Sequence, residues 1–276
     1  MMSIAVNSFR YRSKRSDELL RERLVKLARE KPRYGYRRLQ VLMEREGERV
    51  NHKRLYRVYR AEGLCLKRKK RKHCARSGSP ARPATAANQE WALDFAHDVI
   101  AAGRAIRVLS VVDVYTRECL ALEVDTGFAS RRVTRVLDEV IARRDRPVAI
   151  RCDNGPEFTS RHFLAWSNEE RIELRHIQPG KPTQNAHVES FHGRLREECL
   201  RMNWFTNLFD ARRKVAAWKN EYNQERPHSS LDYRTPNQFA EVCRSKSYGK
   251  DVDFVHLENA DGVSHFATAP ATGLIS

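Results

Sequence analysis

The sequence lacks any long apolar run, and this absence limits the cellular locations that we expect for the protein. No stretch of about 18 apolar residues occurs among its 276 residues, so we predict no segment that crosses a membrane. The first residues also lack the apolar segment of a secretory signal. We therefore expect the chain to stay in the cytoplasm.

Cysteine is scarce, and its spacing does not indicate a metal site. None of the six cysteines forms a C-x-x-C pair, and none stands with two histidines at zinc-finger spacing. We expect reduced thiols. Neither a Ser-His-Asp nor a Cys-His constellation with suitable flanking residues occurs, so a covalent enzyme intermediate is not favoured. A convincing heptad run is missing too.

Acidic residues are few in the N-terminal third of the chain, which is strongly basic. Residues 1–82 contain 26 Lys and Arg against 8 Asp and Glu, a balance of +18, whereas residues 83–276 contain 26 against 27, a balance of −1. Such a concentrated excess is typical of a protein that binds a polyanion. Nucleic acid fits best because phosphate contacts release counterions. An anionic membrane surface is the weaker alternative.

The basic third is predicted to contain three short helices. They begin near Ser16, Tyr36 and Asn51, and each carries an apolar stripe. Asn51 is expected to cap the third helix, which should reach about Ala61. We predict a small all-α helix-turn-helix-like module over residues 1–66. Candidate DNA contacts lie opposite the apolar stripe of the third helix: Lys53, Arg54, Arg57 and Arg60. The alternative is a solvated basic face.

Residues 67–88 are predicted to be a flexible basic linker. The run K-R-K-K-R-K at 67–72 repels itself, and the Ser, Gly, Pro and Ala that follow have little to bury. Its first residues are candidate phosphate contacts: Lys67, Arg68, Lys69 and Lys70. A merely solvated charge run is the alternative.

The near-neutral remainder has the pattern of an α/β domain. Three strands joined by short turns are expected at 91–100, 105–115 and 118–125, followed by alternating helices (130–144, 161–170) and strands (147–152, 173–177). Further helices are expected at 185–201 and 210–223. This order predicts a mixed sheet with flanking helices over residues 89–240, of the ribonuclease-H-like class. Residues 241–276 form a tail that the pattern does not assign.

Three carboxylates stand out as candidate metal ligands in this domain. Asp94 lies in the predicted strand W-A-L-D-F, Asp153 lies in I-R-C-D-N-G-P-E-F, and Glu189 lies in N-A-H-V-E-S-F-H, with 35 residues between the last two. Mg²⁺ prefers oxygen ligands and leaves positions open for phosphate oxygens. Two such ions support phosphodiester chemistry. Three ordinary surface acids are the alternative.

The motifs around these acids resemble those of a known family. The D-N-G-P-E-F and N-x-x-x-E-S-F-H motifs, together with Y-N-x-x-R-P-H-S-S-L at 222–231 and G-Y-R-R-L near residue 35, resemble insertion-sequence transposases. More closely, they are similar to the second-reading-frame protein of bacterial elements with two overlapping frames. The resemblance spans roughly residues 30–240. It implies a core like that of retroviral integrase, although the His/Cys zinc module that precedes the core in retroviral integrases is missing.

The resemblance also implies roles for residues and partners. Asp94 would bridge a pair of Mg²⁺ or Mn²⁺ ions, Asp153 would hold one of them, and Glu189 would complete the other. The chain would cut at the terminal repeats of its element and join the freed 3′-OH to target DNA. It would act as an oligomer on DNA in a bacterial nucleoid, with an upstream-frame partner or fusion. A ribonuclease-H-like nuclease and a DNA-binding regulator with an inactive core remain alternatives.

Several residues near the three acids have weaker predictions. Asn154 and Gly155 are expected to form a tight turn, with a positive φ at Gly155. Glu157 is expected to make structural hydrogen bonds rather than bind metal. Candidate DNA contacts are Lys181 in the loop 178–184 and, on the helix after it, His192 and Arg196; for these two a solvated helix face is the alternative. Four further residues match the family pattern without an assigned chemical role: Asp113, Asn223, Arg226 and His228.

Overall fold

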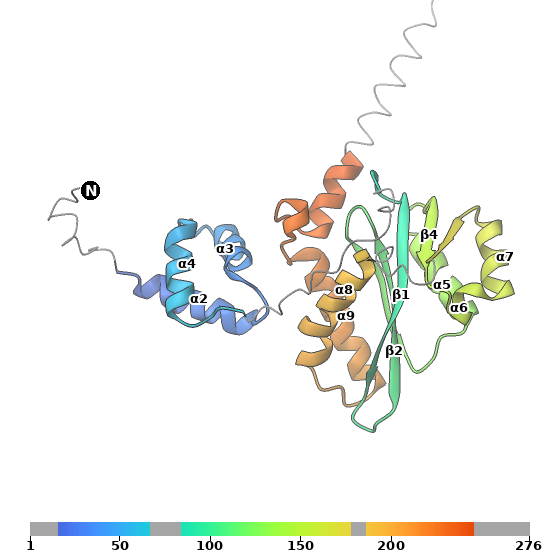
Figure 1. The fold of residues 1–276 in the computed structure, drawn as a ribbon, viewed down its shortest axis with the longest axis horizontal. Helices are drawn as coiled ribbons and strands as arrows, with labels where there is room; N and C mark the ends of the chain where they lie inside the picture. Colours follow the sequence, from blue (N-terminus) through green and yellow to red (C-terminus); the bar gives the residue numbers. More distant parts are fainter. Residues whose placement is uncertain (1–15, 67–83, 178–185, 246–276) are drawn as a thin grey trace, which may run out of the picture.

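The computed structural model describes residues 16–66, 84–177 and 186–245. Its first group of elements is helical: α2 (Glu18–Glu30), α3 (Tyr36–Arg45) and α4 (His52–Ala61) (Figure 1). Its second group combines strands and helices: β1 (Glu90–Val99), β2 (Ala105–Asp113), β3 (Cys119–Asp125), α5 (Ser130–Ile141), β4 (Ala149–Cys152), α6 (Pro156–Thr159), α7 (Arg161–Glu169), β5 (Glu173–His176), α8 (Ala186–Glu198), η2 (Leu200–Met202), α9 (Leu208–Gln224) and η3 (Ser229–Leu231). Residues 236–245 are also helical.

The helical module has an apolar core of its own. Leu24, Leu39, Met43 and Leu55 are fully buried and pack together, so all three helices contribute to one cluster. The Asn51 side chain accepts a hydrogen bond from the Lys53 backbone N–H at 2.9 Å, which confirms the predicted cap of α4. Three helices of this length cannot be stable alone, so their mutual burial holds the module together.

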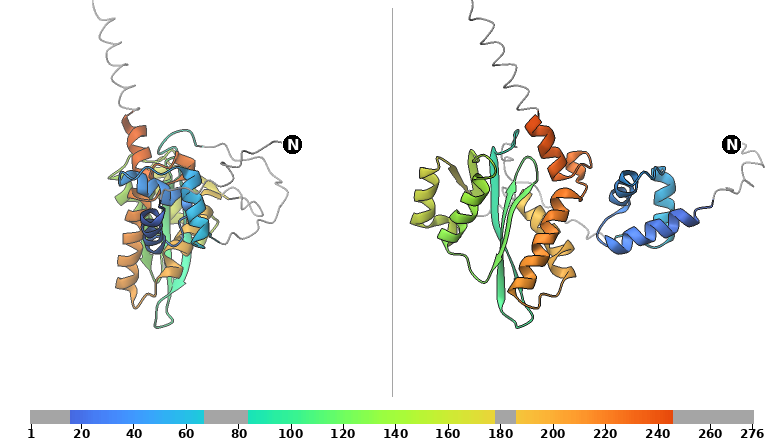
Figure 2. Two further views of the ribbon diagram at one scale, coloured as in Figure 1. Left: turned by 90° about the vertical axis from the view of Figure 1, so that its left-hand side faces the viewer. Right: turned by 180° about the vertical axis from the view of Figure 1, so that it is seen from behind.

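The second group is built on one mixed five-stranded sheet in the order β3-β2-β1-β4-β5. The first three strands pair antiparallel, as short turns require, and β4 and β5 join parallel to β1 through helical crossovers. Helices α5, α6 and α7 lie on one side of the sheet, and α8 and α9 lie on the other (Figure 2). The result is a three-layer α/β/α arrangement.

Alternate residues of β1 face the two helical layers. Trp91, Leu93 and Phe95 are buried in the cluster that includes α5 and α7. Ala92 packs with Val188 of α8, and Ala96 lies in the cluster that contains residues of α8 and α9. Because side chains alternate along a strand, Asp94 shares the face of Ala92 and Ala96 and points toward α8.

The helical module contacts the core through the end of α9 and the residues after it. Lys31 pairs with Glu221 at 2.8 Å, and the Arg45 guanidinium donates to the backbone oxygen of Glu225 at 2.7 Å. Arg38 donates to the Pro227 backbone oxygen at 3.2 Å. In both Figure 1 and Figure 2, α3 lies on the core side of α4.

The order and type of the predicted elements are confirmed, with differences at their ends. The helix expected at 185–201 ends at Glu198 and continues as the 3₁₀ turn η2, and the short helix α6 after Asp153 was not predicted. The prediction of a positive φ at Gly155 is wrong, because its φ is −60° and its ψ is 151°. No helix of the described residues is long and apolar enough to cross a membrane.

Candidate active site and nucleic-acid interface

Asp94 and Asp153 belong to neighbouring parallel segments of the sheet, Asp94 on β1 and Asp153 just after the end of β4. The last register partners of β1 and β4 are Ala92 and Arg151, and Asp94 and Asp153 each follow two residues later. Neighbouring strands are about 4.8 Å apart. Asp153 follows directly after the last residue of β4 and is exposed, whereas Asp94 is half-buried. The fold therefore places two acids that are far apart in the sequence at the same end of neighbouring strands.

Glu189 approaches this pair from the α8 side. Val188 packs against Ala92, and one turn later the His192 ring reaches Asp94, with 3.3 Å between Nδ1 and Oδ2. Glu189 lies in the turn between these two contacts and is exposed. Helix α8 thus packs on β1 on both sides of Glu189 in sequence, through Val188 and His192.

The donor set suits a hard divalent cation by its chemistry: three carboxylates, two of them exposed. The side chains are nevertheless not gathered, since the described residues contain no group of three or more His, Cys, Asp or Glu placed to hold a metal ion. The residue types fit a magnesium site, and their assignment as ligands stays a prediction.

Two neighbouring acids have structural partners. Asp113 is fully buried, and its carboxylate accepts hydrogen bonds from the backbone N–H groups of Asn88, Tyr115 and Thr116 at 2.7 to 2.8 Å. Glu157 accepts a hydrogen bond from Arg107, which confirms the structural role predicted for it. Burial, the largest single influence, raises the pKa of Glu157, but the Arg107 hydrogen bond and charge, a backbone hydrogen bond and the charge of His97 together outweigh burial and lower that pKa.

Gly155 is tightly placed between two carboxylates. A Cβ atom at this position would lie 3.0 Å from the Asp153 Oδ1 and 3.0 Å from the Glu157 Oε2. Its backbone N–H also donates to the Asp153 Oδ1 at 3.0 Å. The glycine is thus needed for close approach to Asp153, and not for the backbone conformation that the sequence suggested.

The candidate DNA-contact residues of α4 fall into two groups. Lys53 and Arg60 are exposed. Arg54 and Arg57 instead converge on Asp17, with Nε–Oδ1 and Nη2–Oδ2 distances of 2.7 and 2.5 Å. Arg54 is partly buried, whereas Arg57 is largely exposed. An acid that precedes α2 therefore holds two of the four guanidinium and ammonium groups proposed for the groove.

The remaining candidate DNA-contact residues differ in how exposed they are, and some lie outside the described residues. Arg196 is exposed on α8, whereas His192 is only 2% exposed. The His192 Nε2 lies 2.7 Å from the Ser110 Oγ, so both ring nitrogens have protein partners. The alternative of a solvated helix face is therefore wrong for His192, whose ring is not exposed for DNA in this structure. Five candidates lie outside the described residues: Lys67, Arg68, Lys69, Lys70 and Lys181.

The family pattern at 222–231 has structural roles that the sequence did not reveal. The Asn223 amide makes two hydrogen bonds to the Cys119 backbone, both 2.9 Å, and so ties α9 to β3. Arg226 is buried and pairs with Glu198 of α8. The His228 ring packs edge-on against Tyr222, with ring centroids 4.8 Å apart. Three polar side chains to which the sequence assigned no chemical role therefore connect elements of the core.

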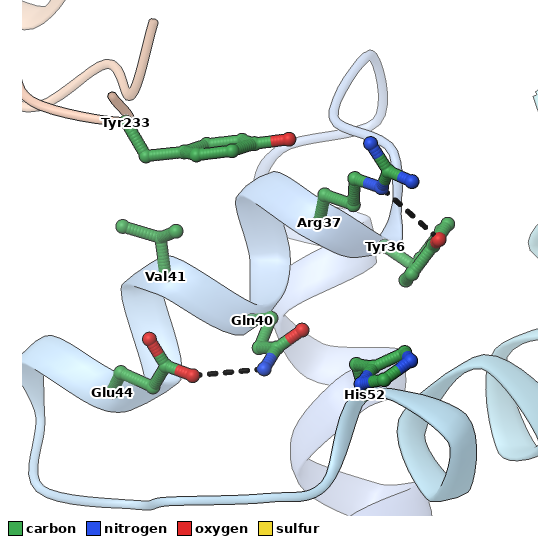
Figure 3. A pocket seen from close by; sticks show the side chains of 7 residues that line it. All are labelled: Tyr36, Arg37, Gln40, Val41, Glu44, His52 and Tyr233. Carbon is green, nitrogen blue, oxygen red and sulfur yellow. Dashed lines mark hydrogen bonds between the residues drawn. The ribbon is translucent and has the colours of Figure 1, made fainter. Parts of the chain in front are cut away.

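Two pockets lie on the helical module rather than at the three acids. One, of about 370 Å³, lies between α3, the start of α4 and the core residue Tyr233 (Figure 3). Gln40 donates to Glu44 at 2.8 Å along its wall. The other is lined by Glu44, Arg49, Val50 and Asn51. Neither is lined by Asp94, Asp153 or Glu189.

Comparison with known proteins decides the family. Residues 84–182 and 170–236 match two family models described as integrase core domain, and residues 14–72 match an HTH-like domain. A 31.7 kDa protein of insertion element IS407 from Burkholderia multivorans is 45% identical over 83% of this chain and 83% of that protein. The chain belongs to the insertion-element transposases that have an integrase core domain.

Two further relatives extend the comparison. A 39.2 kDa protein of insertion element IS476 from Xanthomonas euvesicatoria is 44% identical to this transposase over 86% of the chain and 69% of that protein. The transposase InsD of insertion element IS2 from Escherichia coli is 29% identical over 76% of the chain and 74% of that protein. Membership of this family makes the chain a nucleotidyl-transfer enzyme, and its HTH-like domain implies DNA binding.

Solved structures show the same fold at low sequence identity. A simian T-cell lymphotropic virus intasome in complex with the PP2A regulatory subunit B56 gamma contains a chain with a TM-score of 0.52 and 16% identity to the transposase, over 92% of this chain and 79% of that chain. The catalytic core domain of HTLV-2 integrase, in complex with magnesium, covers 56% of the transposase and 98% of that chain, with 17% identity and a TM-score of 0.47. The first of these structures and the integrase core domain match agree with the ribonuclease-H-like fold expected for the core.

Proposed function

We propose that this transposase cleaves and joins DNA through a pair of Mg²⁺ or Mn²⁺ ions held by Asp94, Asp153 and Glu189. The observation that supports the proposal is the parallel register of β1 and β4, in which Ala92 pairs with Arg151 and Asp94 and Asp153 each follow two residues later, while Glu189 lies in the first turn of α8, which packs on β1 through Val188. Bound ions of this kind activate an attacking oxygen and stabilise a leaving one. The task of the protein is to present carboxylate oxygens at fixed positions.

Conservative substitutions test this proposal. Asp94→Asn, Asp153→Asn and Glu189→Gln each remove a charged oxygen ligand at nearly constant size. We expect each to abolish Mg²⁺-dependent cleavage and joining of the element's terminal DNA while the Kd for that DNA changes little. Asp98→Asn is a matched control, because Asp98 lies on the same strand and its Oδ1 only accepts from the Val99 backbone N–H. Substantial activity in any of the three variants excludes that residue from the ligand set.

The same assay separates the alternative functions. A ribonuclease-H-like nuclease would cut the DNA without joining the 3′-OH to a target. A DNA-binding regulator with an inactive core would do neither, although it would still bind. Joined products that depend on all three acids support the transposase mechanism against both alternatives.

We also propose that the module 1–66 binds the element's ends and that the linker 67–88 contacts phosphates. Support comes from the +18 balance of residues 1–82 and from the exposure of Lys53 and Arg60 on α4. Base recognition needs a side chain held in fixed geometry, which a helix provides. Lys53→Ala should therefore narrow the difference in Kd between terminal-repeat and random DNA. A good base contact is worth about 1–3 kcal/mol of such discrimination.

The linker residues should act differently. Replacing Lys67, Arg68, Lys69 and Lys70 together with Gln should weaken binding to both DNAs equally and make the salt dependence shallower, by about 0.9 in the log–log slope per lost phosphate contact. A competition titration at several salt concentrations measures both effects. Equal Kd values of the wild-type protein for both DNAs would make the module a non-specific tether only.

The same proposal covers the remaining DNA contacts and the assembly of the protein on DNA. Lys181 and Arg196 are proposed to contact DNA near the cleaved phosphate, and Arg54 and Arg57 to do so from α4. We propose that the transposase acts as an oligomer on DNA within the cytoplasm, at the nucleoid, with an upstream-frame partner. Sequencing one frame upstream of the coding region tests for that partner, and light scattering of the DNA complex tests the oligomer. An absent upstream frame excludes the partner.

A further inference from the structure

His192 is a buried side chain that links Asp94 to the interior of the core. It comes from α8, is 2% exposed, and lies beneath the face of β1 that carries the acids. Its Nδ1 faces the Asp94 Oδ2 at 3.3 Å and its Nε2 faces the Ser110 Oγ at 2.7 Å. Since both nitrogens are engaged, the ring cannot rotate without losing a buried polar contact.

Both oxygens of the Asp94 carboxylate have a polar neighbour in the protein. Oδ1 accepts a hydrogen bond from the Phe95 backbone N–H at 2.7 Å, and Oδ2 faces the His192 ring. A carboxylate oxygen has two lone pairs, so each oxygen keeps one for a further partner. About a quarter of the Asp94 side chain stays exposed, which leaves that capacity accessible from outside.

Ser110 completes the arrangement from the neighbouring strand. It is the register partner of Asp94 on β2, and its hydroxyl lies 3.1 Å from the Asp94 backbone oxygen. When the neutral His192 ring directs an Nδ1–H toward Asp94, its Nε2 is an acceptor, so the single Ser110 hydroxyl proton is donated to Nε2 rather than to the Asp94 backbone oxygen. Asp94, Ser110 and His192 each come from a different element: β1, β2 and α8.

We propose that His192 is a positioning residue that orients the Asp94 carboxylate toward a divalent cation, with Ser110 fixing the tautomer and rotation of the ring. The inference rests on the proposed role of Asp94 as a metal ligand. Groups that hydrogen-bond to a ligand fix its direction, and their loss costs roughly 10–100-fold in metal affinity. The contact that matters is the one between Nδ1 and Asp94.

A matched pair of substitutions distinguishes orientation of Asp94 from simple packing of α8. In His192→Asn the amide nitrogen occupies the δ position and still reaches Asp94, whereas in His192→Gln it occupies the ε position and reaches Ser110. Both side chains are neutral, polar and similar in size. The readout is the Kd of Mn²⁺ alone for the full chain, measured by calorimetry, alongside strand transfer and the thermal midpoint.

We expect His192→Asn to bind Mn²⁺ nearly as well as wild type and His192→Gln to bind it roughly 10–100-fold more weakly. A Gln variant that binds Mn²⁺ as tightly as the Asn variant overturns the proposal. Should the Gln variant not fold, Ser110→Ala replaces it. That change frees the ring and is expected to weaken Mn²⁺ binding roughly tenfold, and wild-type affinity there overturns the proposal equally.

Asp94→Asn, measured in parallel, separates this proposal from the one on which it rests. If Asp94→Asn binds Mn²⁺ like wild type, the assignment of Asp94 as a metal ligand is wrong, and with it the role of His192. If Asp94→Asn loses Mn²⁺ while the Asn and Gln variants of His192 bind equally, only the positioning role is wrong.

Discussion

Arg226 forms a two-pronged ion pair with Glu198 in the interior of the protein, with Nε–Oε2 and Nη2–Oε1 distances of 2.8 and 2.6 Å. The two side chains are 2% and 8% exposed. The guanidinium also lies 5.8 Å from the ring centres of Tyr34 and Tyr222, so one cation contacts the helical module and α9 together. Such a pair is stable only because each charge satisfies the other.

Replacing one partner of this ion pair should destabilise the protein far more than replacing both. Glu198→Leu leaves a buried guanidinium unpaired, and we expect it to lower the free energy of unfolding by about 3–5 kcal/mol. The double variant Glu198→Leu/Arg226→Met should recover most of that loss, since apolar residues of similar volume replace the pair. Urea denaturation of the full chain measures both, and a double variant no more stable than the single one contradicts the argument.

The buried His228 should make stability depend on pH. Burial lowers its pKa to about 2, and nearby cations act in the same direction: Arg226, Arg38, Arg117 and Arg194. Its Nε2 has no hydrogen-bond partner among the described residues. An unfolded His has a pKa near 6.5. Below that pH the unfolded chain binds a proton that the folded chain does not, so stability falls as the pH drops from about 6.5 toward 2.

His228→Gln should flatten that dependence. One proton corresponds to at most about 1.4 kcal/mol per pH unit. The difference in unfolding free energy between wild type and His228→Gln should therefore change by up to that amount per unit below pH 6.5. Exposed His52 provides the control, as His52→Gln. A His228→Gln variant whose stability runs parallel to wild type from pH 7 to pH 5 rules out the effect.

Asp17 should restrain DNA binding by α4. Its carboxylate engages Arg54 and Arg57, which would otherwise be free for phosphates. Asp17→Asn should tighten binding to random DNA and steepen the log–log salt slope by about 1–2, as expected for one or two added phosphate contacts. Glu18→Gln removes the same charge one residue away, where Glu18 pairs only with Arg21 of its own helix. Equal effects of both changes would indicate net charge alone.

Gly155→Ala should impair catalysis more than folding. The φ of −60° suits alanine, so the backbone is not strained. The added methyl group would meet the Asp153 Oδ1 and the Glu157 Oε2, both ends of side chains that can move. We expect a change in unfolding free energy within about 1 kcal/mol, together with a clear loss of strand transfer as Asp153 shifts. Full activity would show that the position of Asp153 tolerates displacement.

Local pattern accounts for much of what the sequence predicted correctly. Helices and strands follow from periodicity, as with Leu55, Val58 and Tyr59 on α4, and the Asn51 cap follows from side-chain chemistry. The pairing of Asp94 with Asp153 is different in kind. It depends on the parallel register of β1 and β4, which lie about fifty residues apart, and local periodicity does not show that register; the motifs around the acids and the family resemblance indicated that they belong to one site.

Residues with long-range polar partners could not be predicted. Periodicity put His192 on a polar face beside Glu189, yet the ring is buried, with a hydrogen bond between Nε2 and Ser110 and with Nδ1 3.3 Å from Asp94. Arg54 and Arg57 looked free for DNA because Asp17 lies about forty residues earlier. A hydrophobic pattern shows which face is apolar, but it does not show which polar atoms will meet across the fold.

The contacts between the helical module and the core have a consequence for the geometry of the reaction. Lys31, Arg38 and Arg45 attach α2 and α3 to Glu221 and the backbone after α9, while α4 stays on the far side of α3 (Figure 1). The contacts between the helical module and the core then set the distance between α4, which would meet a DNA end, and the acids of the core, which would cut it. This distance is then the same whatever the length of the chain segment that joins the helical module to the core.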